Sequence, residues 1–285
     1  MPNKAPFANN LDAYTMFRVP RSIYILQKHV GTHFVEVFAT IFLVAPSMAR
    51  HLHSTIHLCR FYRRAFSCST LRSVLMAIAH HKASVRSMLM RRDICLDRPI
   101  DFRYVGYEAL ADLMRNKIGL IIVTAPVGDR LLLPYALALG DETFCMVTHS
   151  AAKVYPSPEK LEIIAEQPDM SHHFAINAAL SGGKIAVIAA DADANSSRTF
   201  ECDVLGTKYR ISQYPFLQAA LNKSPIFFAT VIPTASDTYT ATIVRLDSPS
   251  AENIDTRAQK MADKYFKQFA DAITAYPTHY RSGQY

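Results

Sequence analysis

The middle of the chain holds an apolar run, a turn and a second apolar run. Residues Leu120–Leu139 read LIIVTAPVGDRLLLPYALAL: Leu120–Val123 suits a buried strand, Pro126 and Gly128 mark a turn, and Leu131–Leu139 has the length of a helix. In α/β folds, buried strands deliver the loops that follow them to one edge of a sheet, where sites usually form. The segment therefore predicts an α/β fold with a site near Gly128.

The remainder of the chain extends this pattern of alternating strands and helices. We expect strands at 101–105, 119–124, 144–148, 184–190, 199–205 and 225–232, and a half-exposed edge strand at 239–246. We expect helices at 22–30, 33–48, 50–66, 70–91, 106–116, 131–139, 159–165, 172–180 and 251–276. Such alternation predicts a central, mostly parallel sheet flanked by helices. We expect two regions, a basic N-terminal helical extension at 1–98 and one α/β unit at 99–285.

Charge divides the chain unevenly. Residues 1–92 hold 13 Lys and Arg against 2 Asp and Glu, whereas residues 93–285 hold 18 against 22. A basic region ahead of an acidic body favours an anionic partner, which is a membrane surface or an acidic carrier protein. A solvated basic surface is the alternative. We expect no nucleic-acid partner, because no recognised binding module occurs there.

Several features bear on the compartment. The apolar centre of residues 33–49 is about nine residues long, too short for a span of roughly 20 residues, and we interpret it as an interfacial or core-packing helix. The apolar row Leu71–Leu89 marks one helical face, and the methionines of Met76–Met90 indicate core packing. Five cysteines without a paired spacing, and a polar N-terminus, favour a cytoplasmic protein with free thiols and no metal site. Peripheral membrane contact through residues 21–92 stays open.

Five stretches in order carry a resemblance to a known family. Phe102–Leu110 reads as a strand followed by Gly-x-Glu-x-Leu, and Asn116–Pro134 is similar to the block gkG-villtaHxGNWExlp. Gly183–Gly206 reads as a Gly-strand-Asp-x-Asp block, and Thr207–Pro233 as a threonine-rich turn that leads to a buried strand and a proline. Tyr265–Arg281 is similar to a closing helix with the pattern P-x-Q-y-x-W. Together they resemble the lysophospholipid acyltransferase superfamily, in its branch of lipid A lauroyl and myristoyl transferases.

The resemblance implies an α/β sandwich with an acyl-chain groove, a membrane-associated N-terminal helix, and an acyl carrier protein thioester as donor. It implies no cofactor beyond this acyl thioester cosubstrate, which an acyl-CoA would also supply. Catalysis in the family uses a histidine that withdraws the acceptor's proton and an acidic residue spaced His-x4-Asp/Glu. Aligned through Gly128, these two positions are Pro126 and Leu131, which cannot do this chemistry. The motif is degenerate, and the standard mechanism is not available.

Other residues near the same sheet edge are candidates for the missing chemistry. Asp129 follows Gly128 and is either a general base or the cap of the next helix. His149 follows the strand at 144–148 and would be a base beside Asp129, or a loop histidine without a role. Asp191 and Asp193 follow the strand at 184–190 and would hold a cation, perturb each other's ionisation, or accept backbone hydrogen bonds in a turn.

Three basic residues are candidates for binding a substrate phosphate, such as that of phosphopantetheine or a phospholipid. They are Arg130, Lys208 and Arg210, with surface solvation as the alternative. These observations predict a divergent acyltransferase that moves an acyl group from a thioester to an amine or hydroxyl. An amine needs less help from a base, which favours it. The alternative is a catalytically inactive relative that binds acyl groups or acts as a scaffold.

Overall fold

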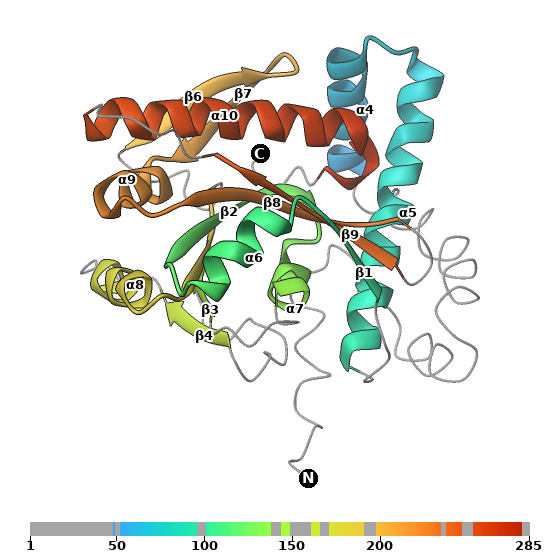
Figure 1. Cartoon of the computed structure of the whole chain (residues 1–285). Coiled ribbons are helices and arrows are strands. Elements are labelled where there is room, and N and C mark those ends of the chain that lie inside the picture. The colour runs from blue at the N-terminus through green and yellow to red at the C-terminus, as the bar shows by residue number, and fades with distance from the viewer. Residues whose placement is uncertain are drawn as a thin grey trace.

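The computed structural model describes residue 48 and residues 52–95, 101–137, 144–148, 161–165, 171–190, 198–234, 238–246 and 253–280 (Figure 1). Its helices are α4 (Leu52–Phe66), α5 (Thr70–Cys95), α6 (Glu108–Arg115), α7 (Leu133–Leu137), α8 (His172–Ser181), α9 (Tyr214–Asn222) and α10 (Ile254–Ala275), with short 3-10 helices η4 (Arg130–Leu132) and η6 (Pro277–His279). Its strands are β1 (Asp101–Val105), β2 (Leu120–Gly128), β3 (Phe144–Thr148), β4 (Leu161–Ala165), β5 (Ile185–Ala189), β6 (Thr199–Val204), β7 (Thr207–Ser212), β8 (Ile226–Pro233) and β9 (Thr238–Arg245).

A seven-stranded sheet in the order β1-β9-β8-β2-β5-β3-β4 forms the centre of the described structure. Strands β8, β2, β5, β3 and β4 are parallel to one another. β9 runs antiparallel to β8, and β1 runs parallel to β9. The expected α/β class with a mostly parallel central sheet is therefore confirmed. The carboxyl ends of β2, β3 and β5 lie at the same edge, which is where α/β folds place their sites.

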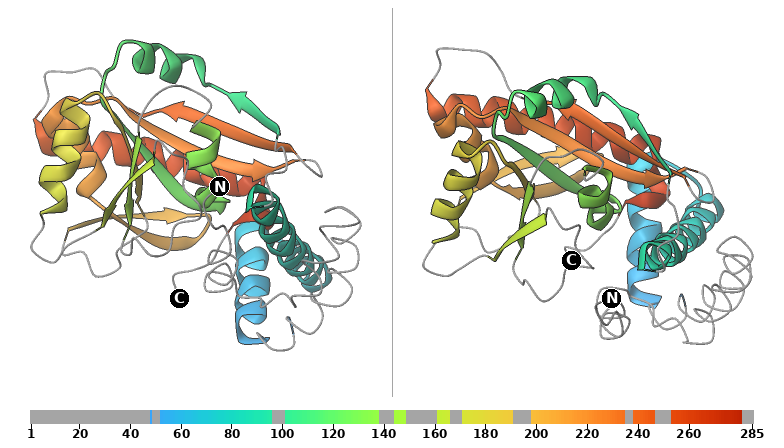
Figure 2. Two further views of the ribbon diagram at one scale, coloured as in Figure 1. Left: turned by 90° about the horizontal axis from the view of Figure 1, so that it is seen from below. Right: turned by 60° about the horizontal axis from the view of Figure 1, so that its bottom comes forward.

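Helices cover both faces of this sheet (Figures 1 and 2). On one face, side chains of β2, β5 and β8 form a core with α8, α9 and α10. On the other face, the alternate side chains of these strands pack against α6, η4 and α7. Burial on both faces explains the continuous apolar sequences of β2, β5 and β8. β6 and β7 form a separate antiparallel hairpin beside α10.

The long closing helix α10 is encoded by a cap and a periodic apolar face. The side chain of Asn253 accepts a hydrogen bond of 2.8 Å from the backbone nitrogen of Thr256, and Asp255 lies in the positively polarised first turn. Buried side chains then recur every three or four residues, at Ala258, Met261, Ala262, Tyr265, Phe266, Phe269 and Ile273. This helix crosses the sheet and delivers η6, which directly follows it, to the end of β2.

Helices α4 and α5 pack on the body of the protein rather than beside it. Leu58, Phe61 and Tyr62 of α4 and Ala77 of α5 belong to the core that contains the α10 face of the sheet. Figure 2 shows the two helices as a pair next to the C-terminal end of α10. Within the described ranges, every helix is too short or too polar to traverse a lipid bilayer.

The apolar row of α5 divides into two parts. Leu71, Val74, Leu75 and Ile78 are exposed, whereas Val85 and Leu89 are fully buried. The side of α5 that faces the protein carries small and polar groups instead, among them Ser73, Ala77, His80 and Ser87. Of the methionines interpreted as core, Met76 is partly buried against the core. The periodicity located the helix correctly, but the first part of its apolar row faces away from the core.

Several expectations about the elements were wrong. Residues 159–165 were expected to be helical, but 161–165 form β4, in keeping with two adjacent β-branched isoleucines in a short apolar run. β9 is not an edge strand, because β1 pairs along its other side. The segment expected to be helical at 131–139 begins with the 3-10 turn η4 and continues as α7, and residues 138 and 139 lie outside the described residues. Apart from residue 48, the helices expected at 22–30 and 33–48 lie outside the described residues.

Candidate functional site

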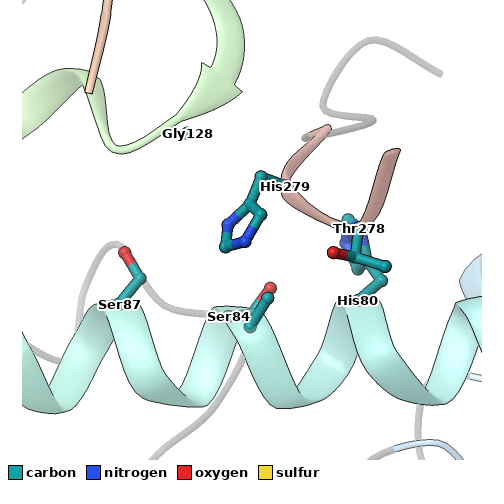
Figure 3. Close-up of a pocket in the computed structure, with 7 residues that line it drawn as sticks. His80, Ser84, Ser87, Gly128, Thr278 and His279 are labelled. Carbon is teal, nitrogen blue, oxygen red and sulfur yellow. The ribbon is translucent and has the colours of Figure 1, made fainter. Parts of the chain in front are cut away.

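A pocket lies where α5, the end of β2 and η6 meet. Its empty volume is about 210 Å³, part of it open to solvent, and it is lined by His80, Ala83, Ser84, Ser87, Gly128, Thr278 and His279. Figure 3 shows the His279 ring reaching into the space between α5 and the Gly128 turn. Pockets that enclose a drug-sized ligand usually measure about 300–1,000 Å³. This pocket is smaller than that, and because its volume includes open solvent, it is a small cleft rather than an enclosed ligand cavity.

Gly128 shapes the wall of this pocket through its backbone. The register between β2 and β8 shifts between Thr124 and Gly128, so the end of β2 bulges out of the regular ladder. Gly128 has φ +74°, and a Cβ at this position would lie 2.2 Å from the carbonyl oxygen of Val231. Only glycine allows this approach. The next residue then donates its backbone N–H to Val231 across 2.6 Å, which turns the chain toward α5.

Asp129 is a fully buried carboxylate at this turn. The hydroxyl of Ser87 on α5 donates a hydrogen bond to its Oδ2 atom. A buried carboxylate is costly to desolvate unless it is hydrogen-bonded, and hydrogen bonds to charged groups are the stronger ones. The bond therefore ties the middle of α5 to the carboxyl end of β2. It also places a hydroxyl that lines the pocket against a potential proton acceptor.

A second polar contact joins α4, α5 and η6. The Tyr62 hydroxyl donates to the carbonyl oxygen of Pro277 across 3.0 Å and lies 3.2 Å from Nδ1 of His80. Burial raises the pKa of the Tyr62 phenol, so it keeps its proton. Because this proton is donated to Pro277, the bond to His80 requires a proton on Nδ1. In neutral His80 the basic nitrogen is then Nε2.

Aromatic contacts hold η6 against the rest of the site. Tyr280 forms an antiparallel bridge with Val127 of β2, and its hydroxyl is hydrogen-bonded to that of Tyr209 on β7. Its ring also packs 4.7 Å from the ring of Phe61, measured between centroids. His279, one residue earlier, is thereby fixed next to Gly128. Four segments that are far apart in the sequence therefore meet at this site, around Tyr62, His80, Gly128 and His279.

We expect replacement of Tyr62 by phenylalanine to loosen η6 while the core stays packed. The variant loses a buried hydrogen bond and leaves the Pro277 carbonyl with one partner fewer, so the free energy of unfolding should fall by about 1–3 kcal/mol. Denaturant unfolding measures this change. Tyr276→Phe is the matched control, since Tyr276 is only half-buried. An equal loss in both variants would contradict the role given to Tyr62.

The structure brings one of the candidate residues from the sequence into this pocket region. Asp129 lies at the expected sheet edge, but the capping interpretation is wrong, because its side chain makes no cap hydrogen bond to η4 and bonds to Ser87 instead. His149, Asp191 and Asp193 lie outside the described residues. The strands that precede them, β3 and β5, are parallel neighbours that end at the same edge as β2.

The basic candidates are spread over two places. Arg130 is exposed at the start of η4, directly after Asp129. Lys208 and Arg210 project from the exposed side of β7, and Arg210 forms an ion pair of 3.0 Å with Glu201. The buried residue between them, Tyr209, is the one that contacts Tyr280. None of the three basic residues lines the pocket.

The two degenerate positions flank the turn. Pro126 is part of the bulge in β2, where a residue without an N–H is tolerated, and Leu131 lies in η4.

Within the described ranges, no three His, Cys, Asp or Glu side chains are grouped as metal ligands. No protein-family model matches the chain, and no curated protein matches it significantly.

Of the seven residues that line the pocket, reasoning from the sequence singled out only Gly128. The six others include His80, Ser84, Ser87 and His279. Ser87 and Asp129 are 42 residues apart, and nothing in a helical pattern marks one serine of α5 as the partner of a distant carboxylate. His279 gave a weak signal, because it lies in the closing stretch where the resembling pattern P-x-Q-y-x-W has glutamine. That difference was a sequence clue to the pocket in addition to the turn at Gly128.

Proposed function

We propose that this protein is a divergent acyltransferase that moves an acyl group from a thioester to an amine or hydroxyl acceptor. The donor would be an acyl carrier protein or acyl-CoA. The observation that supports this is the convergence of Asp129, Ser87 and two histidines around Gly128, at the sheet edge where the degenerate motif lies. Descent from the lysophospholipid acyltransferases is a hypothesis that the sequence resemblance suggests.

In this proposal the base has moved to another element. Proline and leucine occupy the two motif positions, but His279 reaches the same turn from η6. The pattern of the resembling family has glutamine at the position of His279. Relative to that pattern, this chain lacks the histidine of β2 and carries one on η6, which faces the same turn. An imidazole is suited to accept the acceptor's proton near neutral pH and to return it to the leaving thiolate. Positioning of the reactants supplies a further part of the rate.

The test is release of free thiol from acyl-CoA and acyl carrier protein thioesters, followed with a thiol reagent, together with detection of the acylated acceptor by mass spectrometry. Full-length protein is offered both simple amines and hydroxyl compounds. Acceptor-dependent thiol release supports the proposal. Saturable donor binding without turnover would favour the inactive acyl-binding alternative, for which Pro126 and Leu131 are the supporting observation.

We further propose that the exposed face of α4 and α5 contacts an anionic lipid bilayer. The chain has no Asp or Glu between residues 37 and 92. Exposed arginines accompany the exposed apolar row, and the row itself includes Leu71 at 71% and Leu75 at 56% exposure. Exposed apolar side chains beside basic ones on a helix surface favour binding to an anionic lipid interface. Such contact would bring a membrane-bound acceptor or an acyl chain to the enzyme.

We expect wild-type protein to float with vesicles of phosphatidylcholine and phosphatidylglycerol, and less so at high salt. The double substitution Leu71→Glu and Leu75→Glu should lower the bound fraction roughly tenfold, since two buried apolar side chains are lost and two negative charges are added. Leu221→Glu on α9 is the matched control, because Leu221 is 55% exposed outside this face. Equal binding of all three proteins would contradict the lipid contact.

A further inference from the structure

We propose that the transfer proceeds in two steps through a covalent ester on Ser87. This inference rests on the proposed function and adds a nucleophile to it. Ser87 lines the pocket, and its hydroxyl donates directly to the buried carboxylate of Asp129. A hydroxyl hydrogen-bonded to a proton acceptor is the arrangement of an activated nucleophile. Because Ser87 is only 3% exposed, a thioester carbonyl would have to approach it through the pocket that it lines.

The surroundings favour Asp129 as the acceptor of the Ser87 proton. The Asp129 side chain is fully buried, so the pair is shielded from bulk water and their interaction is strengthened by the low local dielectric. Ser87 is on α5, and Asp129 is held by its backbone bond to Val231. Nucleophile and base are therefore held by two separate, packed elements, which reduces the reorganisation needed for attack.

Bonds and protons balance in both steps, and no cofactor is needed. Oγ of Ser87 attacks the thioester carbonyl carbon while its proton passes to Asp129, and the carbon–sulfur bond then breaks. The leaving thiolate takes up that proton, directly or through His279, and departs as a thiol. The acceptor's amine or hydroxyl next attacks the Ser87 ester and gives its proton to His279, and this proton passes to Ser87, directly or through Asp129, as the ester bond breaks.

Ser84 offers an internal comparison. It lines the same pocket on the same helix, three residues before Ser87, but the hydrogen bond to Asp129 belongs to Ser87. Figure 3 shows both side chains on the side of α5 that faces the Gly128 turn. Location in the pocket is shared by both serines, whereas contact with the carboxylate is not. The peptide that carries the acyl group separates these two properties.

The test is to trap the intermediate in the full-length protein. Wild-type protein is mixed with dodecanoyl-CoA in the absence of acceptor, quenched in acid and digested with trypsin. Cleavage after Lys82, Arg86 and Arg91 places Ser84 in the peptide 83–86 and Ser87 in the peptide 87–91. We expect one dodecanoyl group on peptide 87–91. Ser181→Ala, which changes an exposed serine of α8 outside the pocket, should keep the adduct, whereas Asp129→Asn should slow its formation at least 100-fold.

Ser87→Ala should lose the adduct and at least 100-fold of the thiol-release rate, with an unchanged unfolding temperature as the check on its fold. If that variant does not fold, Ser87→Cys serves instead and should form a thioester that neutral hydroxylamine removes. Normal acyl transfer by Ser87→Ala without any adduct would overturn the inference and leave the proposed function intact. Neither adduct nor thiol release in the wild type would overturn both.

Discussion

Replacing His279 with alanine is expected to slow acyl transfer by roughly 10²–10⁴-fold, the usual contribution of a positioned general acid or base. His279 reaches into the pocket from η6, and its neighbour Tyr280 keeps that segment anchored to β2 without the imidazole. The fold should therefore survive the change. The measurement is the rate of thiol release at saturating donor, with circular dichroism and the unfolding temperature as checks on structure.

Two further variants separate the chemistry of His279 from its bulk. His279→Gln keeps a hydrogen-bonding side chain but cannot take up a proton near neutral pH, and we expect it to be as slow as the alanine variant. His53→Ala removes an exposed histidine of α4 and should keep the wild-type rate. A glutamine variant with wild-type activity would show that His279 only binds substrate. The general base would then be another group.

Gly128→Ala is expected to cause the largest loss of stability among simple substitutions at the site. The new methyl group would lie 2.2 Å from the carbonyl oxygen of Val231, and the residue would remain at φ +74°. Positive φ costs a non-glycine residue about 1–3 kcal/mol, and displacement of β8 adds to this. We therefore expect a loss of more than about 3 kcal/mol, measured by denaturant unfolding, and collapse of the adjacent pocket.

Gly182→Ala is the matched control for this prediction. Gly182 ends α8 with φ −80°, and a Cβ there would approach the backbone no closer than 3.3 Å. Its substitution should change the free energy of unfolding by less than about 1 kcal/mol. If the two alanine variants were equally stable, the bulge between β2 and β8 would have to be more adaptable than its geometry indicates.

The alternation of strands and helices was readable from the sequence because buried parallel strands leave a distinct mark. The apolar runs located β2, β5 and β8 correctly, and the periodic apolar face located α10. Short elements were harder to assign, since a five-residue, mostly apolar run such as β4 fits a helix or a strand equally well until its neighbours are known. The place of β9 inside the sheet depends on β1, more than 130 residues earlier.

The site was only partly predictable for a related reason. Asp129 could be located because it follows directly from the strand and turn of β2. Its partner Ser87, and the histidines at 80 and 279, approach from elements that are distant in sequence and meet it only through packing. The interpretation of Asp129 as a cap failed because local geometry does not show that α5 passes close enough to offer a hydroxyl.

Four of the seven residues that line the pocket come from α5, which belongs to the basic N-terminal third of the chain. This third is therefore no detachable anchor. Shortening the protein to its α/β portion would strip three pocket-lining polar groups and uncover aromatic side chains around Tyr280, inviting aggregation. Any swap of N-terminal helices between relatives, whether by recombination or by engineering, would exchange reaction chemistry together with whatever those helices bind.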